Sequence, residues 1–390
     1  MSDSHTTRQL DAHGQALGLT LKPLLQAIPR DCFAISPWRA WATLARQLSV
    51  IALLVFALDR LPLHADGRLA LELPALATLW VLLGWSFTGL FILGHDCGHY
   101  AFSKRRWVND LLGDLIMATL FSSYKAWKLV HNQHHVWSNV RGKDVGWPEQ
   151  MKTRRELAQA SGAQRFLNWF VYGSPWGLLL GPWLVRPRFW LIERGSVPQL
   201  GRLTQRDRRA LRFSLALMVL CTGSVVGGLL AYGGLWALVK FYAAPAFVAA
   251  AVGGLLILLQ HSSEDALVFD PEDHTPFRSQ VVGTYDTRYP RLLEWLVLDV
   301  NLHLVHHLTP RVPWYALRRA TAALKEAYPE CVQERRFSFS LLRELWARPA
   351  LERRSEGYLV RVEAPAPVAA PTHEPRRPQR LPAGLLGSRA

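Results

Sequence analysis

The sequence predicts an all-α integral membrane protein, with four transmembrane helices in two hairpins and a helical cap on the cytoplasmic side. Three observations lead to this prediction. Four apolar segments are close to the ~20 residues that a helix needs to cross the hydrocarbon core of a bilayer. The connection within each pair of segments is short, and the basic residues are concentrated in the other connections. Clusters of histidine follow two of the apolar segments and lie in the long central connection.

The four predicted spans pair in the order of the sequence. Residues 59–73 join the first two, whereas only Tyr232, Gly233 and Gly234 join the last two. A connection this short requires a tight hairpin of two antiparallel helices. The spans are expected at residues 41–58, 74–94, 211–231 and 235–260.

The distribution of charge predicts the orientation of these spans. The stretch from His95 to Arg209 contains 18 Lys or Arg and 8 Asp or Glu, whereas residues 59–73 contain only Arg60 and Arg68 as basic residues. Basic residues near the ends of spans remain on the cytoplasmic side of a membrane. The N-terminus, the central connection and the C-terminal part are therefore expected to be cytoplasmic. The membrane is expected to be a bacterial inner membrane.

The remaining segments are predicted from their length and composition. Residues 1–40 form a polar N-terminal segment, and residues 41–345 are expected to form one membrane domain. Within it, Leu111–Tyr124 is too short to cross, and Phe166–Ile192 is rich in tryptophan and interrupted by prolines, so both are predicted to be buried or interfacial. The tail at residues 364–390 is rich in Pro, Ala and Arg and is predicted to be disordered.

The composition also narrows the classes of partner. The formal net charge of +15 would suit nucleic acid, an anionic membrane surface or an acidic protein. The apolar segments favour the membrane surface, and no nucleic-acid partner is expected. The four cysteines lie far apart without a CxxC pair, so neither an iron–sulfur cluster nor a zinc ribbon is predicted.

Eight of the 14 histidines fall into three clusters, HDCGH, HNQHH and HLVHH. Residues three or four apart share a face of a helix, so each cluster can direct two or three imidazoles to one place. His261, at the inner end of the predicted fourth span, is a ninth candidate. The clustered residues are His95 and His99, then His131, His134 and His135, then His303, His306 and His307.

The number and position of these histidines predict a site for two metal ions. All nine lie near span ends on the side predicted to be cytoplasmic, so they can converge at one depth. One ion in a protein takes about four to six ligands, which is fewer than nine. Imidazole suits zinc, copper, iron and nickel, so the spacing alone does not separate iron from zinc. A single pair of histidines is common on helix surfaces, but three clusters on one side are not explained that way.

At these residues the sequence resembles the membrane fatty-acid desaturase family, most of all its Δ12/ω6-type members. The likeness covers roughly residues 75–330 and includes the order and spacing of the clusters. The matching stretches are GHDCGHYAFSKRRWVNDLLGD (94–114), KLVHNQHHVWSN (128–139), LLQHSSED (258–265) and NLHLVHHLTPRVPWYAL (301–317).

The resemblance implies a di-iron centre held by the nine histidines and an apolar tunnel for an acyl chain. The implied reaction uses O₂ and two external electrons to remove two hydrogens from adjacent carbons of a lipid-linked acyl chain, which leaves a cis double bond and two waters. Because the chain has no HPGG haem motif, we expect a separate electron donor, a ferredoxin or a cytochrome b5-like protein. Some members carry an asparagine where this chain has Ile257, and Gln260 is a polar candidate to replace it.

Carboxylates often orient the imidazoles of a metal site through the second ring nitrogen. Each acidic candidate can also be a helix-end or solvated charge. The candidates are Asp96, Asp110, Asp114, Asp144 and Asp299, with Asn139 and Asn301 as weaker ones. The basic run Lys104–Arg106 is expected to face anionic lipid headgroups or an acidic donor.

Other functions remain open from the sequence. The nearest is another oxidation by the same site, such as hydroxylation of a lipid or attack on an alkane or carotenoid. A zinc-dependent membrane hydrolase would share the histidines but consume no O₂. A metal transporter would need polar residues along its spans, which are nearly free of them.

Overall fold

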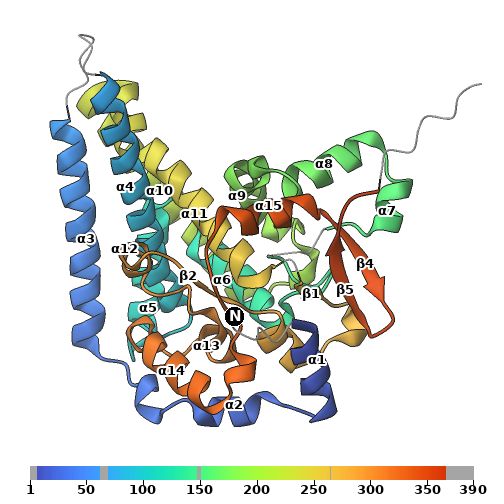
Figure 1. Ribbon diagram of the computed structural model, residues 1–390. Coiled ribbons are helices and arrows are strands. Elements are labelled where there is room, and N and C mark those ends of the chain that lie inside the picture. The colour runs from blue at the N-terminus through green and yellow to red at the C-terminus, as the bar shows by residue number, and fades with distance from the viewer. Residues whose placement is uncertain (1–6, 62–68, 147–150, 264, 366–390) are drawn as a thin grey trace, which may run out of the picture.

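The computed structural model describes residues 7–61, 69–146, 151–263 and 265–365. The molecule is mostly helical, with a group of long helices on one side and shorter helices and small sheets packed below and beside them (Figure 1). The tail predicted to be disordered lies outside the described residues from position 366 onward.

Three helical stretches in the described part of the chain are long and apolar enough to cross a membrane: Pro37–Arg60, Leu71–Gly98 and Gln205–His261. They belong to α3 (Pro37–Arg60), α4 (Leu69–Gly98), and the run of α10 (Gln205–Leu238), the π-helical η4 (Val239–Ala243) and α11 (Ala244–His261). The helices extend beyond the predicted spans by several residues at most ends, because the polar residues that flank the apolar cores continue the same helices.

The third stretch is broken at the position of the predicted turn. Its 57 residues would extend for about 85 Å as one straight helix, far more than the thickness of a bilayer. At Gly233 and Gly234 the backbone leaves the helical conformation. Gly234 has φ 67° and ψ −156°, a conformation that glycine adopts without the steric cost that a Cβ would impose. The two glycines therefore divide the stretch into two apolar helices.

Helices α4 and α11 pack closely through small residues. A Cβ placed on Gly84 would lie 2.5 Å from Val248 Cγ1, so only glycine permits this approach. One turn further along α4 the two helices also share a polar contact, since Thr88 Oγ1 donates to the carbonyl of Ala249 at 3.3 Å. This packing brings the last turns of α4 and α11 to the same level, and both turns carry histidines.

A hairpin of α5 (Arg106–Thr119) and α6 (Tyr124–Trp137) follows α4. Ser123 caps α6, since its hydroxyl accepts a hydrogen bond from the Ala126 N–H, and it also donates to Ser214 Oγ of α10 at 3.0 Å. The segment predicted at Leu111–Tyr124 lies about five residues too late in the sequence, since α5 ends at Thr119 and Tyr124 already begins α6. The hairpin holds the second histidine cluster beside the first.

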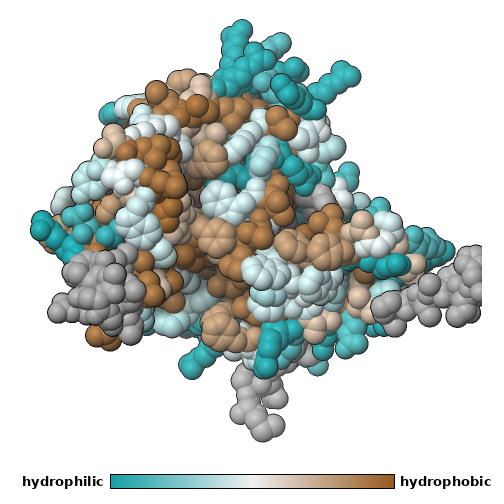
Figure 2. All heavy atoms as spheres, turned by 90° about the horizontal axis from the view of Figure 1, so that it is seen from above, coloured by the Kyte–Doolittle hydropathy of each residue, from teal (hydrophilic) through white to brown (hydrophobic). Residues whose placement is uncertain are grey.

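The tryptophan-rich segment forms α8 (Gly162–Tyr172) and α9 (Pro175–Trp190), after the short α7 (Arg154–Gln159). Large apolar side chains on α8 and α9 are exposed, as expected for an interfacial segment. Figure 2 shows apolar side chains over much of the face seen from above, with hydrophilic side chains toward its rim. The exposed side chains of α8 and α9 include Phe166, Trp169, Trp176 and Leu184.

The rest of the chain packs below and beside the long helices. Its helices are α1 (Thr7–Ala16), α2 (Leu21–Ala27), α12 (Arg291–Leu296), α13 (His303–Leu308), α14 (Leu317–Ala327) and α15 (Phe339–Ala347). The buried apolar residues of α1, α2, α13 and α14 form one core, which includes Val281, Val305 and Leu324. Those of α12 and α15 pack with α4 and α11 instead. The third histidine cluster lies on α13 inside this region.

Two small sheets were not predicted by the all-α assignment. One is antiparallel with the order β1 (Leu267–Val268), β5 (Tyr358–Val362), β4 (Ala350–Arg354). The other pairs β2 (Asp286–Arg288) with β3 (Glu334–Arg336) in parallel, and Asp286 lies opposite Glu334. These strands are two to five residues long, too short for a clear alternating pattern. Of these strands, only β4 and β5 form a local hairpin, whereas β1 with β5 and β2 with β3 pair across large sequence separations.

Candidate metal centre

The structure brings all nine predicted histidines together. They form two groups of four, and in each group one ring nitrogen of every histidine lies within 4.8 Å of the others. We call them the His95 group (His95, His99, His131, His306) and the His303 group (His134, His261, His303, His307). Both groups draw on α6 and α13. The His95 group adds the end of α4, and the His303 group adds the end of α11.

The separations between ring nitrogens are those of ligands on a shared ion. In the His95 group, His95 Nε2 lies 3.1 Å from His306 Nε2, and His131 Nε2 lies 3.0 Å from His99 Nε2. In the other group, His261 Nε2 lies 3.1 Å from the Nε2 atoms of both His134 and His303. Two nitrogens at right angles, each about 2.1 Å from one ion, are about 3.0 Å apart. Each group therefore has the geometry to hold a metal ion.

The ninth histidine lies between the two groups. His135 Nε2 is 3.0 Å from His131 Nε2 of the His95 group. Its ring also stacks on that of His307, of the His303 group, with centroids 4.5 Å apart. His135 thus joins the two groups into one continuous centre.

The imidazoles of α13 are buried and neutral. Burial, together with the neighbouring histidines, holds the pKa of His303, His306 and His307 well below the usual value. Neutral imidazole is the form that binds metals. His307 Nε2 is buried and has no hydrogen-bond partner among the described residues, whereas its Nδ1 bonds to Gln280 Oε1 at 2.9 Å. A bound ion would satisfy that nitrogen, so the residues present fit a metal site.

Two of the predicted carboxylates contact the histidines. Asp96 Oδ1 bonds to His95 Nδ1 at 3.1 Å, and Asp144 Oδ1 bonds to His134 Nδ1 at 2.9 Å. Asp144 is fully buried and also accepts from the backbone N–H groups of Asn139 at 3.0 Å and Gly146 at 2.7 Å. Each carboxylate leaves the Nε2 of its histidine directed at the centre.

The other three predicted carboxylates lie elsewhere. Asp110 accepts from Lys128 Nζ at 3.0 Å and from the hydroxyl of Tyr124. Asp114, one turn further along α5, shares this face, and neither residue contacts a histidine in the described part of the chain. Asp299 pairs with Arg318 instead. Their proximity to the clusters in the sequence does not by itself bring them to the rings, since their partners are Lys128, Tyr124, Ser214 and Arg318.

Residues outside the clusters also hold the histidine rings in place through hydrogen bonds. Gln280, in the π-helical segment Arg278–Val282, binds His307 and donates to the carbonyl of His135. Ser138 Oγ and the carbonyl of Gly283 lie 3.1 and 3.0 Å from His261 Nδ1. Ser138 lies four residues after His134, a helical spacing that could have suggested it. No spacing links Gln280 or Gly283 to the clusters, so the sequence carried no signal for them.

Asn139 and Gln260 bind backbone carbonyls instead of a ring. Asn139 has φ 59°, a left-handed conformation that asparagine tolerates, and its amide donates to the carbonyls of His261, Leu267 and Gly283. Gln260 donates to the carbonyl of Val300 at 2.8 Å, so its amide is engaged away from the ring nitrogens.

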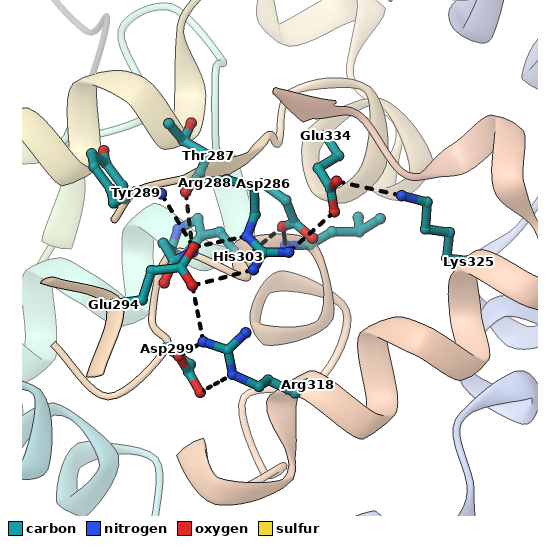
Figure 3. A network of polar contacts seen from close by, with 12 residues as sticks. Asp286, Thr287, Arg288, Tyr289, Glu294, Asp299, His303, Arg318, Lys325 and Glu334 are labelled. Atoms are coloured by element: carbon teal, nitrogen blue, oxygen red, sulfur yellow. Dashed lines mark hydrogen bonds and ion pairs between the residues drawn. The ribbon is translucent and has the colours of Figure 1, made fainter. Parts of the chain in front are cut away.

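Asp286 fixes the start of α13. Its Oδ1 accepts from the N–H groups of His303 at 2.6 Å and Leu304 at 2.9 Å (Figure 3). Burial raises the pKa of the Asp286 carboxyl to about 6, against the opposing effect of these two bonds. The carboxylate satisfies two N–H groups that the first turn of a helix leaves unpaired. It thereby sets the position of the third histidine cluster.

Glu294 is the centre of the ionic network in Figure 3. Its buried carboxylate accepts from Arg288 Nε at 2.8 Å, from Arg318 at 3.0 Å and from Asn301 Nδ2 at 3.1 Å. Burial alone would raise the pKa of Glu294, but the bonds from the arginines lower it to about 2. The network ties β2, α12 and α14 together around the loop that leads into α13.

A cavity of about 980 Å³ lies beside the centre. Its walls come from α4, α6, α8, α9, α11 and α15 and are mostly small or apolar, including Ala249 and Gly253. Trp127 lines the cavity and stacks on the ring of His131 at 4.5 Å. Gly146 also lines it, and a Cβ there would lie 3.0 Å from His134 Nδ1. Among the described residues no histidine lines the cavity, but two of its lining residues, Trp127 and Gly146, each neighbour a histidine of one group.

The model of the family described as fatty acid desaturase matches residues 72–338 of the chain. The chain belongs to the fatty acid desaturase family. This confirms the resemblance seen in the three clusters and makes the protein a desaturase, an oxidoreductase. The candidate membrane helices and the paired histidine groups agree with membership of a membrane-bound, metal-dependent family.

Similar proteins carry names of lipid desaturases. The chain is 30% identical over 341 residues to the sn-1 oleoyl-lipid 12-desaturase of Synechocystis sp.. The aligned residues cover 87% of this chain and 91% of the relative. It is also 30% identical to the sn-1 oleoyl-lipid 12-desaturase of Anabaena variabilis, over 87% of this chain and 92% of the relative. The chloroplastic omega-6 fatty acid desaturase of Spinacia oleracea is 26% identical, over 84% of this chain and 68% of the relative.

Proposed function

We propose that this desaturase introduces a cis double bond at the Δ12/ω6 position of a fatty acyl chain carried by a membrane lipid. The observation that carries the proposal is the apolar cavity, whose lining includes Trp127 and Gly146, each next to a histidine of one group. Its volume is near the upper end of the ~300–1,000 Å³ range of ligand pockets, which suits a long flexible chain. The names of the relatives support the position of the double bond.

The nine histidines are the proposed ligands of two iron ions. The His95 group would hold one ion and the His303 group the other, with His135 between them. An alkyl C–H has no acidic proton, so side-chain acid–base chemistry does not reach it, and the ions when bound supply the activation of O₂. The neutral state of the α13 imidazoles supports this ligand role.

The protein's own residues position the substrate and exclude water. The cavity wall around Ala249 and Gly253, two to three helical turns before His261, leaves room for methylene groups, and the Trp127 ring lies between the cavity and His131. In the overall reaction the acyl chain gives up two hydrogens. With two electrons from a separate ferredoxin or cytochrome b5-like donor and two protons from solvent, one O₂ becomes two waters.

The proposed placement in the membrane has four spans. They are α3, α4 and the two helices that Gly233 and Gly234 separate. Because the central connection is basic, the N-terminus, the metal centre and the C-terminal part are proposed to face the cytoplasm of a bacterium.

Expression in a host that makes oleoyl lipids but no polyunsaturated ones tests the proposal. Fatty-acid profiling should detect an acid with double bonds at positions 9 and 12, and the His307→Ala variant should give none. A hydroxylated acid without a second double bond would instead favour the alternative, hydroxylation by the same centre. Metal analysis of the purified protein should find two irons per chain, and zinc in their place would contradict the di-iron proposal.

A further inference from the structure

Asp96 connects the metal centre to a surface loop that is remote in the sequence. Its Oδ1 bonds to His95 Nδ1 at 3.1 Å, and its Oδ2 accepts from the backbone N–H of Trp314, also at 3.1 Å. The side chain of Asp96 is buried. Two hydrogen bonds therefore lead from the backbone of Trp314 to a ring in the His95 group.

The Trp314 end of this link lies at the surface of the protein. The Trp314 and Tyr315 rings are 5.2 Å apart, and both residues are partly exposed. The Tyr315 hydroxyl accepts from the N–H of Ser36, just before α3, and the guanidinium of Arg39 lies 5.5 Å from the Tyr315 ring. The guanidinium of Arg46 lies 5.8 Å from the Trp314 ring. The loop after α13 and the start of α3 thus form one surface.

This surface is strongly basic. Residues 30–46 and 309–319 contain six arginines and a single acidic residue, Asp31. Two of the arginines are neutralised, since Arg319 pairs with Asp31 and Arg318 pairs with Asp299 and Glu294. Arg46 lies within the first proposed span, where its guanidinium packs on the Trp295 ring at 4.3 Å. The other three form no ion pair with a described residue, and they are Arg30, Arg39 and Arg311. Such an excess attracts an acidic partner and speeds its association.

The cavity and this surface lie on different sides of the centre. The cavity is lined by residues of α4, α6, α8, α9, α11 and α15, and neither the start of α3 nor the loop before α14 contributes to its walls. In Figure 1 α9 and α15 lie near the centre and α8 at the upper right, whereas α14 and the start of α3 lie at the lower left. A partner on the arginine surface would therefore leave the cavity open to an acyl chain.

We propose that the surface around Arg39, Arg311, Trp314 and Tyr315 docks an acidic one-electron carrier protein, and that electrons enter through Trp314 and Asp96 to His95. The inference rests on the proposed function, because forming two waters from O₂ needs two electrons beyond those taken from the acyl chain. The carrier delivers them one at a time and is itself oxidised. Anionic lipid headgroups would also bind arginines, but binding of a headgroup would not require a hydrogen-bonded link to His95.

The test of docking reverses two exposed charges together, Arg39→Glu with Arg311→Glu. The iron-loaded protein is placed in nanodiscs of neutral phosphatidylcholine, and a reduced plant-type [2Fe–2S] ferredoxin is the probe. At low salt the double variant should bind ferredoxin at least tenfold more weakly and oxidise it at least tenfold more slowly. Its reduction by dithionite, a small ion that needs no docking surface, should stay within twofold of the wild type.

The matched control is Arg165→Glu, which reverses an exposed charge on α8. It should leave the Kd for ferredoxin and the rate of ferredoxin oxidation within twofold of the wild type. Wild-type affinity and rate in the double variant would overturn the proposal. So would an effect of the double variant that appears only in discs of anionic phosphatidylglycerol, since that result identifies a headgroup contact.

The route through Trp314 has its own test. At saturating ferredoxin, Trp314→Leu should slow ferredoxin oxidation at least fivefold with unchanged iron content, and Trp314→Phe should restore most of the rate. An unchanged rate in Trp314→Leu would overturn the route. Product formation by the wild type in the same discs separates the two proposals: a wild type that makes no double bond defeats the proposed function, whereas an active wild type with unaffected variants defeats only the docking surface.

Discussion

Asp144 and Asp110 lie at similar places in the sequence, but the fold gives their carboxylates different roles. Both are acidic residues near the first two histidine clusters in the sequence. Asp144 is fully buried and bonds to His134 and to two backbone N–H groups. The Asp110 side chain is about half exposed and pairs with Lys128. Only Asp144 can hold a ring of the centre in place.

We predict that Asp144→Ala weakens metal binding by about 10–100-fold, because His134 loses the partner that fixes its ring. Asp110→Ala is the matched control and should change metal affinity less than about twofold, since it removes only a partly exposed ion pair. Competition with a metal chelator measures both affinities. Equal affinities in the two variants would contradict the role of Asp144.

Glu294→Gln should lower the free energy of unfolding by about 3 kcal/mol, because the arginines around it would lose the charge that neutralises them inside the protein. Glu326→Gln, at an exposed position of α14, should change it by less than about 0.5 kcal/mol. Denaturant titration of the purified protein in detergent measures both. Similar stabilities would show that the network in Figure 3 contributes little.

At the scale of elements, the cavity exists because α9 and α11 face each other through small residues. Gly253 of α11 lines the cavity, and a Cβ there would meet no atom within 4 Å. A larger side chain at this position can therefore extend into the cavity without displacing a neighbour. Gly228, on α10, has equally open space but does not line the cavity.

These two glycines make a matched pair of substitutions. Gly253→Leu should reduce desaturation of an 18-carbon chain at least tenfold with unchanged metal content, since the new side chain occupies the space proposed for methylene groups. Gly228→Leu should leave activity within twofold, and both changes favour the helix by up to about 1 kcal/mol. Fatty-acid profiling and metal analysis give the two readouts. Full activity of Gly253→Leu would mean that the substrate lies elsewhere.

At the scale of the whole molecule, the buried centre couples stability to pH. His303, His306 and His307 have pKa values lowered by burial, so the folded protein keeps them neutral. In the unfolded chain the same imidazoles take up protons below about pH 6.5. The unfolded state then binds more protons than the folded state, so stability is complete above that pH and falls on acidification.

We predict that the metal-free protein loses stability between about pH 6.5 and 5, by about 1.4 kcal/mol per pH unit for each imidazole that is protonated only when unfolded. The iron-loaded protein should release metal over the same range, because protons compete for the ring nitrogens. Unfolding curves at constant ionic strength and metal release from loaded protein measure the two effects. Stability that rises as the pH falls would contradict the neutral state of the centre.

The sequence by itself determined the features that depend on local periodicity. Apolar length located the long helices, and spacings of three and four placed the histidines of each cluster on shared helix faces. The pair of glycines at 233 and 234 marked the break between α10 and α11. All of these follow from the geometry of a single helix or turn.

Only the tertiary structure decided how the clusters combine. His306 and His307 are neighbours on α13 but belong to different groups, because adjacent residues of a helix point about 100° apart. Which group each ring joins depends on where α4, α6 and α11 end around it. The supports from Gln280 and Asp286, and the link from Asp96 to Trp314, likewise join segments far apart in the chain, so no local pattern could reveal them.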